Sequence, residues 1–176
     1  MKIKLGVLTA AVPLALTTLT GCSMNDEESD DVAYVGTSTS HDAADTVEKI
    51  SSGIYDLIGV KGETSDNRAG VEGCTDKDSD TYFKIVHPWS FYPASPGDLD
   101  TAMRHLKERL PEHGWKIVEY GPDTSKNRNI VLIADNDAQK AGVHIAKMPK
   151  RERPKLSLTV VSGCYKVPEG QKVDHF

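Results

Sequence analysis

One feature limits the possible folds more than any other. In the second half of the chain, an amphipathic segment is followed by four strand-like segments. The amphipathic segment, 95–110, predicts a helix, because its apolar residues recur at three- and four-residue steps. These residues are Leu99, Met103, Leu106 and Leu110. Ser95 can cap this helix, Pro96 suits its first position, and Asp98 completes a capping box. Gly114 predicts its end.

A second helix is predicted over 41–58, where apolar residues also line one face. They are Val47, Ile50, Ile54 and Leu57. The strand patterns cover 81–89, 115–120, 130–134, 143–147 and 156–165. Short connections between strands indicate antiparallel neighbours. We therefore predict an α+β domain, with an antiparallel sheet of about five strands and two helices packed on one face.

The first 22 residues predict an export signal that ends at a cysteine. Lys2 and Lys4 precede an uncharged run, 5–19, which is shorter than the roughly 20 residues needed to span a bilayer. The run fits the apolar part of a signal peptide. Leu19-Thr20-Gly21-Cys22 resembles the lipobox of bacterial lipoproteins. That resemblance implies a diacylglyceryl group on the Cys22 thiol and cleavage that leaves Cys22 as the N-terminus. The alternative is an ordinary signal peptide with a chance cysteine.

The predicted lipid places the protein at the cell membrane, anchored on its extracytoplasmic face. A diacylglyceryl group supplies the two chains that stable anchoring requires. Residues 23–41 are polar, acidic and poor in large apolar side chains, which is typical of a disordered segment. The predicted organisation is a signal peptide at 1–21, a lipidated disordered tether at 22–41, an α+β domain at 42–167 and a flexible tail at 168–176.

The charge of the mature chain argues against some partners. Only two of the 21 Lys and Arg residues, and none of the 26 Asp and Glu residues, lie in positions 1–21. The remainder is therefore acidic and lacks the basic footprint of a nucleic-acid-binding protein. The sequence also indicates no polybasic patch that would attract anionic lipid headgroups.

The remaining two cysteines, Cys74 and Cys164, predict a disulfide bond, because disulfides persist in exported proteins. Cys74 precedes the first predicted strand and Cys164 ends the last one. If those strands are antiparallel neighbours, both cysteines lie at the same end of the sheet. The alternative is two free buried thiols.

The layout of the chain resembles the LppA-like lipoproteins of actinobacteria. The resemblance rests on the lipobox, the amphipathic segment 41–58, a cysteine before the first strand, "LDTAMRHLKERLPEHGW" leading into a strand, and a final strand closing on "VSGC". It spans most of residues 42–165 and is one of pattern and spacing. It implies a cell-envelope lipoprotein and carries over no catalytic residue.

Known catalytic and metal-binding motifs are missing from the sequence. Asp76, Asp78 and Asp80 begin like an EF-hand loop, but Thr81 and His87 stand where that loop needs Gly and Glu. The histidines lack metal-ligand spacing, and there is neither a nucleophile elbow nor a phosphate-binding loop. We predict no catalytic residue, no metal and no cofactor. A triad assembled in space from distant residues stays an alternative.

The least routine stretch is "HPWSFYP", 87–93, in which Trp89, Phe91 and Tyr92 lie between two prolines. These aromatic residues either cover the edge or one end of the core, or form a partner surface for a peptide, glycan or lipid. The expected function is that of a non-enzymatic lipoprotein that binds or modulates an unknown envelope protein or ligand. The alternatives are a small-ligand or lipid carrier, with a cavity between helices and sheet, and a hydrolase.

Overall fold

The computed structural model describes residues 33–176. The predicted signal peptide, Cys22 and most of the predicted tether lie outside these residues. The helices are α1 (Ser40–Ile58), α2 (Asp98–Arg109) and the short 3-10 helix η1 (Pro111–His113). The strands are β1 (Tyr34–Thr37), β2 (Gly62–Thr64), β3 (Gly70–Gly73), β4 (Tyr82–Pro93), β5 (Lys116–Pro122), β6 (Ile130–Asn136), β7 (Ala141–Met148), β8 (Lys155–Ser162) and β9 (Cys164–Lys166).

The strands form one sheet in the order β1-β9-β4-β8-β7-β6-β5, and β2 and β3 pair with the other edge of β4. The pair β1–β9 is parallel, and the other pairs are antiparallel. The α+β class is confirmed, but the predicted antiparallel sheet of five strands is wrong, because the sheet is mixed and has nine strands. The additional strands, β1, β2, β3 and β9, span three or four residues each, too few to give a periodic signal.

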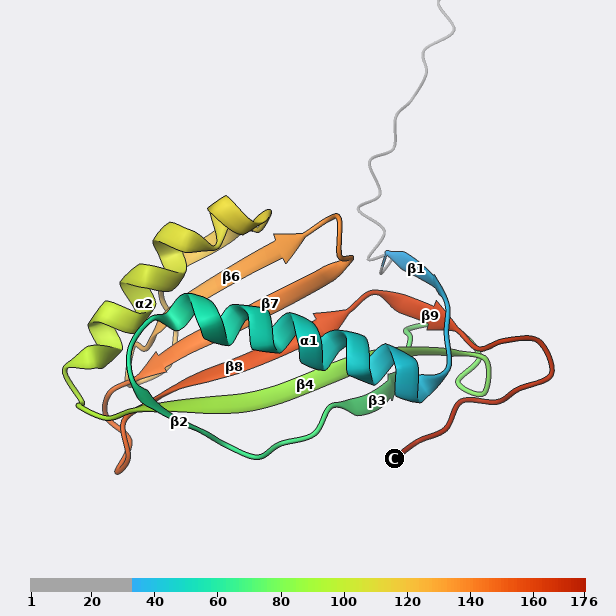
Figure 1. The fold of residues 1–176 in the computed structure, drawn as a ribbon, viewed down its shortest axis with the longest axis horizontal. Coiled ribbons are helices and arrows are strands. Elements are labelled where there is room, and N and C mark those ends of the chain that lie inside the picture. Colours follow the sequence, from blue (N-terminus) through green and yellow to red (C-terminus); the bar gives the residue numbers. More distant parts are fainter. Residues whose placement is uncertain (1–32) are drawn as a thin grey trace, which may run out of the picture. The chain divides into compact units, whose positions relative to one another are not determined.

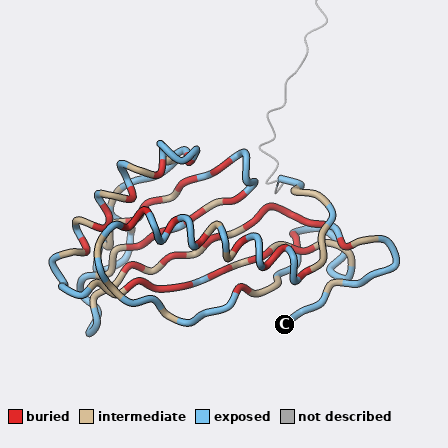
Figure 2. Tube along the Cα trace, viewed as in Figure 1, coloured by how far each residue is buried: buried red, intermediate tan, exposed pale blue. Residues whose placement is uncertain are grey.

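Both helices pack on the same face of the sheet (Figure 1). The apolar stripes that predicted the helices are buried there, except that Ile50 is half-buried. The long strands bury alternate residues against the helices, including Phe83, Ile85 and Phe91 from β4 and Leu156, Leu158 and Val160 from β8. Figure 2 shows this alternation of buried and half-buried positions along the central strands. Within residues 33–176, neither helix is both long and apolar enough to span a bilayer.

The two helices start differently. Thr39 caps α1, since its hydroxyl accepts from the backbone N–H of Asp42 at 3.2 Å. The predicted side-chain cap of α2 by Ser95 is wrong. Gly97 occupies the N-cap position of α2, and Ser95 contributes its backbone carbonyl, which accepts from Asp98 N at 2.9 Å. A turn over 95–98 therefore precedes the helix and takes the place of a capping box.

The predicted domain boundaries need correction at both ends of the domain. Strand β1 lies within the predicted tether 22–41 and pairs with β9, next to a bond from Cys164 N to Ala33 O of 2.9 Å. The predicted flexible tail 168–176 folds back on the domain. Val173 N donates to Asp80 O at 3.0 Å, and the ring of Phe176 stacks on His41 at 4.4 Å.

The predicted disulfide is present, since Cys74 and Cys164 are bonded with an S–S distance of 2.02 Å. The reasoning from topology also holds, because β4 and β8 are antiparallel neighbours. Residue 163 separates β8 from β9, so Cys164 begins the short β9 and does not end β8.

Candidate functional site

Strand β4 lacks a paired neighbour on one side over the residues around Pro88. On that side, β2 pairs with β4 as far as Phe91, and Ser90 N then donates to Ser65 Oγ at 2.9 Å. Pairing resumes where Gly70 of β3 lies opposite Val86. Backbone N–H groups of alternate residues point to the same side of a strand. The nitrogen of Pro88 therefore faces the segment 66–69 and has no hydrogen to donate.

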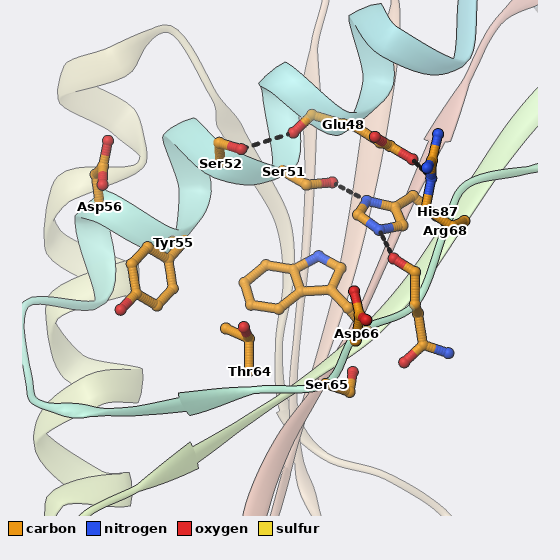
Figure 3. Close-up of a pocket in the computed structure, with 12 residues that line it drawn as sticks. Glu48, Ser51, Ser52, Tyr55, Asp56, Thr64, Ser65, Asp66, Arg68 and His87 are labelled. Atoms are coloured by element: carbon orange, nitrogen blue, oxygen red, sulfur yellow. Dashed lines mark hydrogen bonds and ion pairs between the residues drawn. The ribbon is translucent and has the colours of Figure 1, made fainter. Parts of the chain in front are cut away.

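A groove of about 590 Å³ lies where the segment 66–69 separates from β4 (Figure 3). We call it the α1 groove. It is lined by Glu48, Ser51, Ser52, Tyr55 and Asp56 of α1, by Thr64, Ser65, Asp66, Asn67 and Arg68, and by His87 and Trp89 of β4. Its volume is in the range of small-molecule sites. The groove is open to solvent along its length, so it can also admit part of a larger partner.

His87 connects the three walls of the groove. Its Nδ1 lies 2.8 Å from Ser51 Oγ on α1, and its Nε2 lies 3.0 Å from the carbonyl oxygen of Asn67. A carbonyl can only accept, so Nε2 carries the proton in the neutral ring and Nδ1 accepts from the Ser51 hydroxyl. Both side chains are buried, with exposed fractions of 8% for His87 and 3% for Ser51.

Glu48, on α1, also holds the segment 66–69 in place. Its Oε1 accepts from the backbone N–H of Ala69 at 3.1 Å and from Nε of Arg68 at 3.2 Å. The hydrogen bond from Ala69 holds the pKa of Glu48 below its ordinary value, and the charge of Arg68 adds to this effect against the opposing effect of burial. Glu48 and His87 thus hold the outer wall of the groove in place.

Trp89 contributes a buried donor without an acceptor. The residue is 6% exposed, and no hydrogen-bond partner for its Nε1 exists among residues 33–176. Leaving such a group unpaired costs about 1–3 kcal/mol. Tyr55 lies beside it, with ring centroids 6.5 Å apart, and is 40% exposed. A ligand in the groove would therefore meet the exposed ring of Tyr55, and it could reach the unpaired donor of Trp89 only if the buried Nε1 became exposed.

The charge of the groove is negative. Glu48, Asp56 and Asp66 contribute three carboxylates, against the single guanidinium of Arg68. The exposed ring of Tyr55 can also attract a cation through its π face. Carboxylates and an aromatic face together favour a positively charged polar group.

The Ser51–His87 pair has part of the geometry of a catalytic triad. In a triad, a carboxylate orients the histidine from the nitrogen opposite the nucleophile. Here that nitrogen bonds the carbonyl of Asn67, and the carboxylate of Glu48 bonds Ala69 and Arg68. The buried hydroxyl of Ser51 therefore serves first to join α1 to β4.

The predicted partner surface of Trp89, Phe91 and Tyr92 is not one exposed surface. Phe91 is fully buried in the core, and Trp89 is nearly so, at the groove. Tyr92 is half-buried under the guanidinium of Arg153, 4.0 Å from its ring. Alternation along β4 explains the difference, because Trp89 and Phe91 point toward the helices and Tyr92 points to the other face.

Sequence reasoning did not identify the other residues of the groove. Glu48, Tyr55 and Asp56 lie on the polar side of α1, where polar residues are expected on any amphipathic helix, and Ser51 is a small polar residue within its buried face. One signal was present: Pro88 falls inside a strand pattern, and proline in a strand indicates an unpaired edge.

The acidic turn before β4 is used internally. Asp78 accepts from the hydroxyl of Thr81 and from Asp80 N, and Asp80 pairs with Lys172. In the part of the chain from 33 to 176, no group of three or more His, Cys, Asp or Glu residues could hold a metal ion. Cys22, the predicted lipidation site, lies outside the described residues.

No family model, no curated protein and no solved structure matches this chain.

Proposed function

We propose that the chain is a membrane-anchored extracytoplasmic lipoprotein whose folded domain binds an envelope partner, without enzymatic activity, through the α1 groove. The anchor rests on the lipobox-like Leu19-Thr20-Gly21-Cys22, and the pattern shared with LppA-like lipoproteins supports a role at the cell envelope. The observation that carries the binding site is the unpartnered Nε1 of Trp89, buried beside an open, polar groove.

The partner offers a positively charged polar group to this groove. The carboxylates of Asp56 and Asp66 make no ion pair within residues 33–176, and so they are free to meet a cation. An acceptor on the same group, such as a peptide carbonyl, would satisfy Trp89 Nε1. A basic peptide segment combines both features.

Tryptophan fluorescence tests this function. The chain has two tryptophans, so Trp115→Phe leaves Trp89 as a single reporter. We expect tri-lysine to shift its emission saturably and tri-glutamate to have no effect. Asp56→Asn combined with Asp66→Asn should weaken tri-lysine binding by about tenfold, or about 1.4 kcal/mol, the value of two modest ion pairs together. Asp76→Asn combined with Asp137→Asn changes the net charge equally, away from the residues that line the groove, and should leave tri-lysine binding unchanged. No saturable shift, or equal losses in both variants, would contradict the proposal.

Crosslinking in intact cells tests whether a partner occupies the groove in place. A photoreactive amino acid replaces Tyr55 at the groove or, as a control, Val118 on the edge strand β5, which is 51% exposed. We expect an adduct from position 55 alone. Equal adducts at both positions would indicate nonspecific encounter and would argue against the groove.

The anchor is tested separately with Cys22→Ser. The wild type should enter the detergent phase on phase separation, and the variant should stay in the aqueous phase or keep its uncleaved signal. Wild-type protein found in the aqueous phase would refute lipidation.

A hydrolase is the second candidate, favoured by the 2.8 Å contact between Ser51 Oγ and His87 Nδ1. A fluorophosphonate labels an activated serine covalently. Labelling that Ser51→Ala abolishes would establish this candidate in place of the binding protein. A lipid carrier fits the α1 groove less well, because three carboxylates line the groove.

A further inference from the structure

Two loops that are separate in the sequence meet at one end of the sheet, and both are basic. One loop connects β5 to β6 and spans 123–129. The other spans 149–155, which is the β7–β8 connection with the first residue of β8. Together they contain six basic and two acidic residues. Lys150 Nζ donates to the carbonyl of Asn127 at 3.3 Å, which joins the two loops. We call this surface the basic tip. The whole chain has a net charge of −5, so the tip stands out against its surroundings.

Four side chains of the basic tip are exposed to a partner, although Lys150 also uses one of its three donors in the bond to Asn127. Lys126, Arg128, Lys150 and Arg151 are exposed and form no ion pair within residues 33–176. Arg153 and Lys155 are engaged instead. Arg153 pairs with Glu63, and Lys155 Nζ donates to Ser90 Oγ at 2.9 Å.

The β5–β6 loop holds its basic residues in a fixed conformation. The Asp123 carboxylate accepts from Ser125 N at 3.1 Å, from Ser125 Oγ at 2.6 Å and from Asn129 Nδ2 at 3.1 Å. Asp123 N and Asn129 O close the loop at 2.8 Å. Arg128 lies within it at φ 50°, a left-handed conformation that is uncommon outside glycine. Such order lowers the entropy lost when the loop binds a partner.

The tip lies far from the N-terminal end of the described residues. Strand β8 leads from the tip at Lys155 to Ser162, next to the point where Cys164 N binds Ala33 O. Eight residues of strand span about 25 Å. The tip therefore lies at the end of the sheet opposite Ala33, from which the chain continues toward Cys22.

We propose that the basic tip binds a linear anionic polymer that carries phosphate groups, through Lys126, Arg128, Lys150 and Arg151. The planar guanidinium of arginine matches phosphate with two parallel hydrogen bonds, and lysine adds point charge. Two loops side by side offer successive charges to successive phosphates. This surface is separate from the α1 groove and independent of what the groove binds. Four of its six basic residues already form a run in the sequence at 150–155, and folding adds Lys126 and Arg128 from the other loop.

The test uses the intact protein in nonionic detergent with long-chain inorganic polyphosphate as the probe. We expect binding that weakens steeply with salt, as counterion release requires. Replacing Lys126, Arg128, Lys150 and Arg151 with Gln should weaken binding at least tenfold and flatten the salt dependence. The matched control replaces Lys49, Lys77, Lys116 and Lys140 with Gln, which gives the same net charge, and should keep most of the affinity.

Equal losses in the two variants would overturn the proposal, since they would show attraction to net charge alone. Polyglutamate that binds as tightly as polyphosphate would overturn the preference for phosphate. If phosphatidylglycerol vesicles bind the tip and polyphosphate does not, the partner of the tip is a membrane surface, and the proposal of a polymer is wrong. Asp56→Asn combined with Asp66→Asn should leave polyphosphate binding intact, which separates this result from the fate of the groove.

Discussion

Neighbouring serines on α1 face different surroundings. Ser51 is buried and its hydroxyl donates to His87, whereas Ser52 is exposed and donates to the backbone carbonyl of Glu48 at 2.9 Å. Ser51→Ala leaves the buried Nδ1 of His87 without a donor, so we expect a loss of about 1–3 kcal/mol in the free energy of unfolding. Ser52→Ala is the control and should change it by no more than about 0.5 kcal/mol. Urea denaturation measures both. Equal effects would show that the Ser51–His87 bond contributes nothing.

Glu48 gives the groove wall a dependence on pH. A carboxyl whose pKa is lowered by folding stabilises the protein above its ordinary value of 4.5, and this contribution disappears as the pH falls through the lowered value. Glu48→Gln keeps an acceptor for Ala69 N but removes the charge. We expect the variant to melt about 1–3 °C below the wild type at pH 7, and the gap to shrink as the pH falls below 4.5. A gap that stays the same down to the acid limit of folding would contradict this account.

At the scale of single elements, two glycines show where the chain needs a missing side chain. A Cβ on Gly62 of β2 would lie 2.4 Å from the carbonyl oxygen of Tyr92 and 2.5 Å from the ring of Phe91. Gly53 lies in α1, and a Cβ there would meet nothing within 4 Å. Gly62→Ala should therefore destabilise the domain by about 1–3 kcal/mol. Gly53→Ala should stabilise it by about 0.5–1 kcal/mol. Thermal melts of both variants decide the matter, and a neutral Gly62→Ala would mean that β2 can move away from β4.

The long elements could be predicted from the sequence because each repeats its period several times. Both helices and strands β4 to β8 have this property, and alternation correctly placed Phe83, Ile85 and His87 on one face. The short strands gave no such signal, and their positions depend on partners far along the chain. The groove was missed for the same reason. It arises where β2 ends and β3 begins along β4, and no local pattern encodes that pairing.

At the scale of the whole molecule, the disulfide joins the loop before β4 to the strand next to it. The two cysteines are 90 residues apart, and a link of that length stabilises by up to about 4–5 kcal/mol in chain-entropy models. Thiol alkylation of the folded, unreduced protein, produced in an oxidising compartment, should find neither Cys74 nor Cys164 free. Reduction should lower the urea midpoint markedly. Free thiol at either position would show that the bond does not form under these conditions.

The N-terminal boundary of the domain determines how far the chain can be shortened. The composition of 23–41 predicts that all of this segment is dispensable, but the structure includes residues 34–37 in the sheet. Removing residues before Ser40 deletes the bonds from Cys164 N to Ala33 O, 2.9 Å, and from Ser38 N to Lys166 O, 3.0 Å. It also removes Thr39, the cap of α1, whose loss alone costs about 1 kcal/mol.

We therefore expect a protein that begins at Ser40 to be less stable than one that begins at Ala33 by at least about 2 kcal/mol, the sum of the cap and one or two net hydrogen bonds. The protein that begins at Ala33 should match one that begins at Cys22 to within about 0.5 kcal/mol, because residues 23–32 are polar and acidic. Urea denaturation of the three proteins measures both differences. If the protein that begins at Ser40 were as stable as the other two, β1 would contribute nothing, and the folded domain would begin at α1. A loss already present on starting at Ala33 would mean that the acidic segment stabilises the domain.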